Sequence, residues 1–180
     1  MTPAGLAELG LGLEYGVVGH SVTRAEWPTA AQELIDDIRR RLGGQADGIE
    51  HIGSTAVVGL LAKPIVDIAI RLVPGADPLS AITALEADGY AYRGDAGNDG
   101  GHVLVLEIQP WVRVAHLHVV AHDDPQWDSW RGFVARLRAD PQARAAYEQT
   151  KRELAVAHPN DRDAYTEGKS ATVEAILRPG

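Results

Sequence analysis

The most constraining feature of this sequence is an apolar run from Pro64 to Val73 that only Asp67 and Arg71 interrupt. Its length and β-branched content are typical of a central strand that is covered on both faces of a sheet. Pro64 suits the first position of such a strand, where no ladder donor is needed. A carboxylate in so apolar a strand is costly unless it is paired, hydrogen-bonded or bound to a metal. Asp67 is therefore the first candidate for a functional residue.

The rest of the chain predicts helices and one hairpin around this strand. A helix begins near Pro28, carries apolar residues at helical spacing and ends at Gly43-Gly44. Residues 102–108 and 112–121 are typical of a β-hairpin. Further helices are expected over residues 78–88, 127–137, 140–157 and 161–177. This order of helix, mixed sheet and helical tail predicts an α+β fold.

A length of 180 residues suits one domain. We expect residues 1–12 to be loosely ordered and residues 13–180 to form a single domain, with a short edge strand at residues 15–18.

Composition narrows the classes of partner. The net charge of −8 argues against nucleic acid, which usually needs a basic face, but it allows a local basic pocket for a small anion. The absence of cysteine excludes disulfides and thiolate metal sites. Neither a basic signal-peptide start nor an apolar run near the ~20 residues of a membrane span is found. We therefore expect a cytoplasmic protein with no membrane partner.

The loop before the central strand has the composition of an anion site. Gly53 lets the backbone approach a ligand closely, and Ser54 and Thr55 add hydroxyls and backbone N–H groups that can face a phosphate. Lys63 lies just before the strand and could neutralise a bound anion or Asp67 itself. Each of these residues taken singly has an ordinary structural explanation, but their order together favours a ligand site.

The run HIGSTAVVGLLAKPIVDI, residues 51–68, resembles the signature of the GrpB family, commonly HIGSTSVPGLxAKPIIDI. The resemblance extends over about residues 15 to 178. It is carried further by Asp88-Gly89-Tyr90, by the segment HLHV at residues 116–119, by a tail from Trp130 to Lys151, and by Tyr165 and Lys169. Ala56 and Val58 depart from the serine and proline usual in the signature.

The resemblance implies a nucleotidyltransferase-like mixed sheet with flanking helices and a C-terminal helical segment. In that superfamily two acids at i and i+2 of a strand hold Mg²⁺ ions that bind a triphosphate. Asp67 fits the first acid, whereas the second position is Ala69. This departure argues against nucleotidyl transfer by the ordinary two-metal scheme.

The hairpin offers a different donor set. His116 and His118 are two residues apart on one strand and so project to the same face. With Asp67 they could form a cluster for a divalent metal other than Mg²⁺, and Glu107 on the partner strand could supply another carboxylate. Alternatively, the two histidines could bind a substrate phosphate or act as acid and base, or pack in the sheet without a functional role.

Lys151 and Lys169 lie on predicted C-terminal helices, where lysines are usually solvated, but they match positions of the family and are candidates for phosphate binding. Three functions stay open from the sequence. The domain transfers a nucleotidyl group from a nucleotide, with Mg²⁺ or another divalent metal. Or it is a non-catalytic binding or folding-support domain with a protein partner. Or it is a repurposed enzyme that uses Asp67, His116 and His118.

Overall fold

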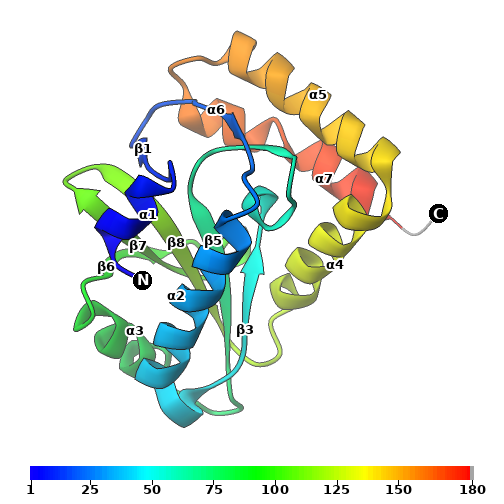
Figure 1. Cartoon of the computed structure of the whole chain (residues 1–180). Coiled ribbons are helices and arrows are strands. Elements are labelled where there is room, and N and C mark those ends of the chain that lie inside the picture. The colour runs from blue at the N-terminus through cyan, green and yellow to red at the C-terminus, as the bar shows by residue number, and fades with distance from the viewer. Residues whose placement is uncertain (179–180) are drawn as a thin grey trace.

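The computed structural model describes residues 1–178 and shows a mixed β-sheet between two layers of helices (Figure 1). Six strands form the sheet in the order β3-β5-β8-β7-β6, with β1 paired to one end of β8. Strands β5 and β8 are parallel, and the other pairs are antiparallel. The strands are β1 (Leu13–Glu14), β3 (Ala46–Ile52), β5 (Val66–Leu72), β6 (Ala91–Asp95), β7 (His102–Gln109) and β8 (Val112–Val120). A separate ribbon pairs β2 (Ser21–Val22) with β4 (Leu61–Ala62).

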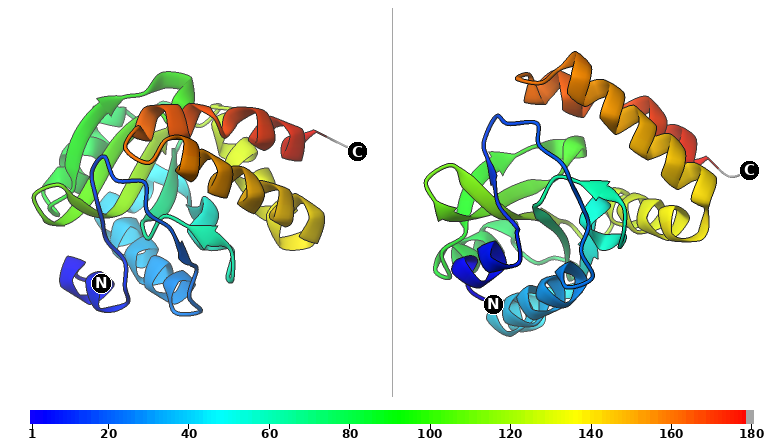
Figure 2. Two further views of the ribbon diagram at one scale, coloured as in Figure 1. Left: turned by 90° about the horizontal axis from the view of Figure 1, so that it is seen from above. Right: turned by 45° about the horizontal axis from the view of Figure 1, so that its top comes forward.

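The helices bracket this sheet. They are α1 (Pro3–Glu8), α2 (Trp27–Leu42), α3 (Pro78–Glu86), α4 (Gln126–Ala139), α5 (Pro141–Ala157), α6 (Arg162–Glu167) and α7 (Ser170–Leu177). Short 3-10 turns are η1 (Gly43–Gln45), η2 (Ser54–Ala56) and η3 (Gly97–Asp99). Figure 2 shows the sheet between α1 and α2 in blue and α5, α6 and α7 in orange and red.

Alternation along β5 sends its side chains into two different environments. Val66, Ile68 and Ile70 are fully buried in the main core with the inner faces of α1, α2 and α3. Asp67 and Ala69 point to the opposite face, toward α4 and the C-terminal helices. The central-strand prediction for this segment is confirmed, because β5 lies between β3 and β8. Its polar residue faces the second layer of helices.

Local signals in the sequence explain where the C-terminal helices begin. The side chain of Asp140 caps α5 by accepting hydrogen bonds from the backbone N–H groups of Gln142 and Ala143, and Pro141 follows at the first helical position. Asp161 caps α6 in the same way through Ala164. The predicted hairpin is also confirmed as β7 and β8, which pair antiparallel.

Three elements differ from the sequence-based expectations. Residues 3–8, expected to be loosely ordered, form α1. Thr2 caps this helix, and its Leu6 is fully buried in the main core. The expected strand at residues 15–18 is displaced to β1 at Leu13–Glu14. The expected final helix is divided into α6 and α7 at Gly168, where a β-carbon would stand 2.4 Å from Leu154 of α5. Close packing of α6 on α5 therefore sets the break.

Among residues 1–178, no helix combines the length and apolarity that crossing a membrane requires.

Candidate functional site

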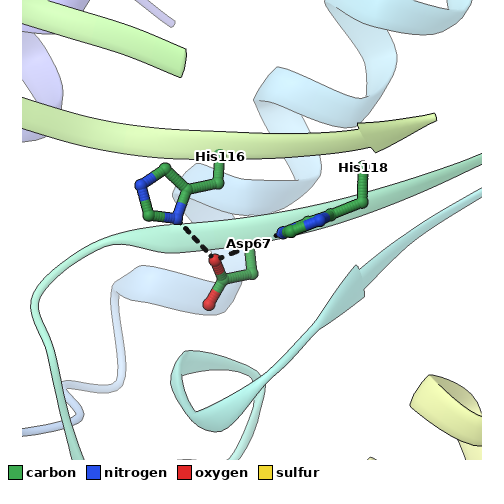
Figure 3. A group of neighbouring side chains, drawn as sticks. All are labelled: Asp67, His116 and His118. Carbon is green, nitrogen blue, oxygen red and sulfur yellow. Dashed lines mark hydrogen bonds and ion pairs between the residues drawn. The ribbon is translucent and has the colours of Figure 1, made fainter. Parts of the chain in front are cut away.

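Asp67, His116 and His118 meet on the sheet face that looks toward the C-terminal helices (Figure 3). Asp67 is paired with His116 across the parallel β5–β8 ladder, and Ala69 is paired with His118, so both imidazoles project to the side of the carboxylate. His116 Nδ1 lies 3.0 Å from Asp67 Oδ1, and His118 Nε2 lies 3.8 Å from the same oxygen. The side chains of His116 and His118 are 16% and 18% exposed, and that of Asp67 is 30% exposed.

Hydrogen bonding orients both rings. His118 Nδ1 lies 3.1 Å from the carbonyl oxygen of Gly100, which can only accept, so Nδ1 donates and Nε2 is the nitrogen that faces Asp67. His116 Nδ1 donates to Asp67, and His116 Nε2 is buried with no hydrogen-bond partner among the described residues.

The same contacts fix the charge of the cluster. Burial favours a high pKa for Asp67, but contacts with the two imidazoles outweigh it and hold this pKa well below its usual range. Burial lowers the pKa of His116 despite its hydrogen bond to Asp67. At neutral pH, Asp67 is therefore ionised and His116 is neutral.

The Gly-Ser-Thr loop lies directly beside the carboxylate. Ile52, the last residue of β3, pairs with Asp67, and Gly53 then turns the chain into η2 with φ of 69°. His51 Nε2 is 2.9 Å from Thr55 Oγ1, which ties the turn to β3. Burial lowers the pKa of His51 to about 4, so this ring is neutral. His51 thus anchors the loop.

The chain contains three lysines, Lys63, Lys151 and Lys169, and all three line one small cavity of about 70 Å³ next to Ser54, Thr55 and Asp67. We call this cavity the lysine pocket. The ammonium group of Lys151 donates to Ser54 Oγ at 3.2 Å and to the carbonyl of Leu61. Lys63 and Lys169 lie 4.4 Å and 4.9 Å from the centre of the Tyr165 ring.

Burial and repulsion from neighbouring cations lower the pKa values of these lysines. Burial, then repulsion from Lys169, lowers the pKa of Lys151 to about 7. Burial and repulsion from Lys169 and Arg162 lower the pKa of Lys63 to about 8. Burial likewise lowers the pKa of Lys169 despite the attraction of Asp67. The lysine pocket is a desolvated positive region in a protein of net charge −8.

A larger cavity of about 620 Å³, the main cavity, joins these parts. It contains the cluster of Asp67, His116 and His118, the Ser54 turn and two of the lysines, and many of its other lining residues come from the last third of the chain. Its lining residues include Gly53, Ser54, Lys63, Asp67, Arg113, His116, His118, Trp130, Phe133, Tyr147, Arg162 and Lys169. The main cavity therefore lies between the sheet and the C-terminal helices.

Most predicted site residues come together in the two cavities, and Glu107 is the exception. Its carboxylate lies 2.9 Å from Arg93 and 3.6 Å from Arg113, and it is not part of the Asp67 cluster. The prediction of Glu107 as a metal ligand is therefore corrected. The β7–β8 ladder shifts register on both sides of Glu107, and this shift was invisible in the sequence.

Two further cavity residues were missed. Trp130 lines the main cavity with its ring centre 5.5 Å from that of His118. Arg162 also lines it, and its spacing of three and seven residues from Tyr165 and Lys169 was a helical-face signal that could have identified it.

The donor set does not fit a two-magnesium site. Ala69, at the position of the second acid, is fully buried against Ile52, Val120 and Trp127. Glu50 pairs with Ala69 from the neighbouring strand, but its carboxylate bonds Arg131 at 2.9 Å. A single carboxylate with two imidazoles supplies one oxygen-donor side chain, whereas Mg²⁺ prefers oxygen-rich coordination.

Comparison with known proteins links the chain to one family. The family profile described as "GrpB protein" matches residues 21–179. A UPF0157 protein of Pseudomonas aeruginosa is 39% identical over 153 residues, which cover 84% of this chain and 62% of that protein. A dephospho-CoA kinase of Mycolicibacterium paratuberculosis is 30% identical over 163 residues, covering 78% of this chain and 40% of that protein. The chain thus spans only part of the length of either relative.

Solved structures show the same fold. GrpB from Enterococcus faecalis superposes with a TM-score of 0.69 at 24% identity, covering 89% of this chain and all of that one. A chain of the GLD-2/RNP-8 complex superposes with a TM-score of 0.56 at 10% identity, covering 82% of this chain and 50% of that one. The α+β fold expected from the sequence, with its nucleotidyltransferase-type sheet and flanking helices, is confirmed.

Proposed function

The chain belongs to the GrpB family, and we propose that its main cavity binds the phosphate groups of a nucleotide or another phosphorylated small molecule. One observation carries this proposal: the three lysines of the chain converge on the Ser54 turn. The remaining 14 basic residues are all arginines, distributed along the whole chain. Lysine is a compact point charge that suits a phosphate oxygen.

The contacts of the lysines support an anion as the missing partner. Their ammonium groups contact the Ser54 hydroxyl, the Leu61 carbonyl and aromatic rings, so their charges are not neutralised by carboxylates at these contacts. Burying a cation is costly unless an opposite charge accompanies it. A bound phosphate would supply that charge, and the backbone turn after Gly53 would add N–H donors.

The size and walls of the main cavity suit a nucleotide-sized ligand. Its volume of about 620 Å³ lies within the ~300–1,000 Å³ of typical small-molecule sites. Trp130 and Phe133 of α4 add aromatic surface to this cavity, and Arg162 and Lys169 add cationic groups. A ligand that carries an aromatic base and phosphates would match both kinds of lining.

Calorimetry tests this proposal directly. We expect binding of inorganic pyrophosphate and of at least one of ATP, GTP, CTP and UTP, measured with and without Mg²⁺. Lys169→Gln should weaken that binding about 10-fold or more, since a charge-assisted hydrogen bond contributes ~1.5–3 kcal/mol. Arg152→Gln, which removes an equal charge from the solvent-exposed side of α5, should leave it unchanged. The proposal fails if none of these ligands binds, or if the two variants lose affinity equally.

A second candidate function is that of a non-catalytic binding module, which Ala69 favours. The loss of the second acid removes the ordinary two-metal scheme but leaves the lysine pocket intact. In the dephospho-CoA kinase relative, the matched region is 40% of that protein, so a domain of this kind occurs beside other sequence. Release of pyrophosphate from a bound nucleoside triphosphate would distinguish a transferase from such a module.

A further inference from the structure

We infer that Asp67, His116 and His118 form a site for one first-row transition-metal ion, with Zn²⁺ as the closest match to its geometry. The three potential ligand atoms all lie within 4.8 Å of one another. Ligands bound ~2.0–2.1 Å from a tetrahedral ion stand about 3.4 Å apart. The observed separations of 3.0 Å and 3.8 Å from Asp67 Oδ1 bracket that spacing. Small side-chain rotations, together with a move of the His116 proton from Nδ1 to Nε2 that frees the Nδ1 lone pair, would complete the coordination.

The protein holds each ligand in position before any ion arrives. Two alternate pairs of the β5–β8 ladder, Asp67 with His116 and Ala69 with His118, fix the backbone of all three residues, and strands position ligands more rigidly than loops do. The Gly100 carbonyl accepts from His118 Nδ1, which turns Nε2 toward Asp67. A histidine ligand whose other nitrogen donates to a carbonyl is the usual outer-shell arrangement of a metal site.

Three protein ligands leave a coordination position free, and it opens onto the main cavity. Figure 3 shows the two rings converging on one carboxylate oxygen from β8. Asp67, His116 and His118 all line the main cavity, together with Lys169 and Ser54 of the proposed phosphate site. A site with three protein ligands and an open position is the catalytic type of zinc site. A phosphate oxygen of the bound ligand could occupy that position.

The chemistry of the donors selects against magnesium. Imidazole nitrogen suits zinc, iron, nickel and copper, whereas Mg²⁺ prefers an octahedral set of oxygens. Ala69 removes the oxygen donor that a second ion would need. The inference uses only the Asp67 cluster and none of the lysines, so it stands or fails independently of phosphate binding.

Metal binding to untagged, chelator-treated protein tests the inference with no phosphate ligand present. Co²⁺ serves as the spectroscopic probe, and Zn²⁺ affinity is measured by competition with a chromophoric chelator. We expect one equivalent of Co²⁺ with visible absorption bands of a four- or five-coordinate ion, displaced by Zn²⁺ but not by millimolar Mg²⁺. His118→Gln should weaken Zn²⁺ binding at least about 100-fold, because changes even to outer-shell partners cost ~10–100-fold.

His122→Gln is the matched control. His122 Nδ1 lies 2.9 Å from Asp47 Oδ2, which reproduces the histidine–carboxylate pair without a third ligand among the described residues. This variant should bind Co²⁺ and Zn²⁺ as the wild type does. If His118→Gln does not fold, Asp67→Asn provides the same test with a side chain of equal size.

Three results would overturn the inference. The first is that the wild-type protein binds no stoichiometric Co²⁺ or Zn²⁺. The second is that His118→Gln and Asp67→Asn, shown to be folded by circular dichroism, bind the metal as tightly as the wild type. The third is that millimolar Mg²⁺ displaces Co²⁺ as readily as Zn²⁺ does.

Discussion

Gly53 and Asp67 approach each other so closely that a β-carbon on residue 53 would stand 2.7 Å from Asp67 Oδ2. This contact is the point at which the proposed anion-binding turn meets the carboxylate of the candidate metal site. Gly53 also has a φ of 69°, a conformation that residues with a β-carbon rarely adopt. The two halves of the site are therefore joined through a residue that only glycine can fill without strain.

We predict that Gly53→Ala lowers the free energy of unfolding by about 2–4 kcal/mol, from left-handed strain and from overpacking against Asp67. Gly59→Ala is the control, because Gly59 has a φ of 80° but an added β-carbon there meets nothing within 4 Å. It should cost only about 1–2 kcal/mol. Urea unfolding measures both variants, and equal losses would show that the contact with Asp67 carries no energy.

Lys151 should make stability depend on pH. Its folded pKa of about 7 lies below its ordinary value of 10.5, through burial and through repulsion by Lys169 and Arg152, which Glu148 only partly offsets. Between these values the unfolded chain binds a proton that the folded chain has released. This contribution to stability therefore rises from pH 7 toward pH 10, by at most about 1.4 kcal/mol per pH unit.

Urea unfolding at pH 7 and pH 9 measures this slope. Lys151→Met should reduce it to the part that Lys63 contributes above its own pKa of about 8, whereas Arg152→Met, which changes the exposed neighbouring residue, should keep it. A Lys151→Met protein with the wild-type slope would place the ionisation elsewhere, with Lys63 and its pKa of about 8 as the next candidate.

Ligand binding should protect Lys63 and Lys169 from chemical modification. Acetylation of the native protein by an amine-reactive reagent is expected to be slow at Lys151, which is 2% exposed. Saturating pyrophosphate should slow the reaction at Lys63 and Lys169, because both line the two cavities. Mass spectrometry measures each rate. The internal control is the amino group of Met1, which pairs with Asp37 and is distant in sequence from the site residues. Equal rates with and without pyrophosphate would contradict phosphate binding in the lysine pocket.

Replacing Ala69 by aspartate should not restore an ordinary acidic pair. Residue 69 is fully buried against Ile52, Val120 and Trp127, so a carboxylate there would lack solvent. We predict that Ala69→Asp lowers the free energy of unfolding at pH 7 by about 3 kcal/mol or more. Burial raises the pKa of such a group, so this loss should shrink as the pH falls toward 4. Ala69→Asn has a similar size without a charge, and thermal unfolding of both across pH separates charge from volume.

Local patterns were enough to predict most elements of this fold. The apolar run around Asp67 identified the central strand β5, and alternating residues identified the β7–β8 hairpin. The N-caps Asp140 and Asp161 marked the starts of α5 and α6. These features depend on residues close together in sequence, where spacing and caps decide the structure. The break at Gly168 was missed because it arises from a contact with Leu154 on another helix.

The sequence by itself determined which residues were available. These are a lone carboxylate in a buried strand, two histidines on one face of a hairpin strand, and three lysines. Only the tertiary structure decided that Lys151 reaches Ser54 across 97 residues, and that Glu107 pairs with arginines rather than with the Asp67 cluster. The physical reason is that charges and ligands act over a few ångströms in space. Packing of the C-terminal helices over the sheet sets those distances, and no local spacing in the sequence encodes them.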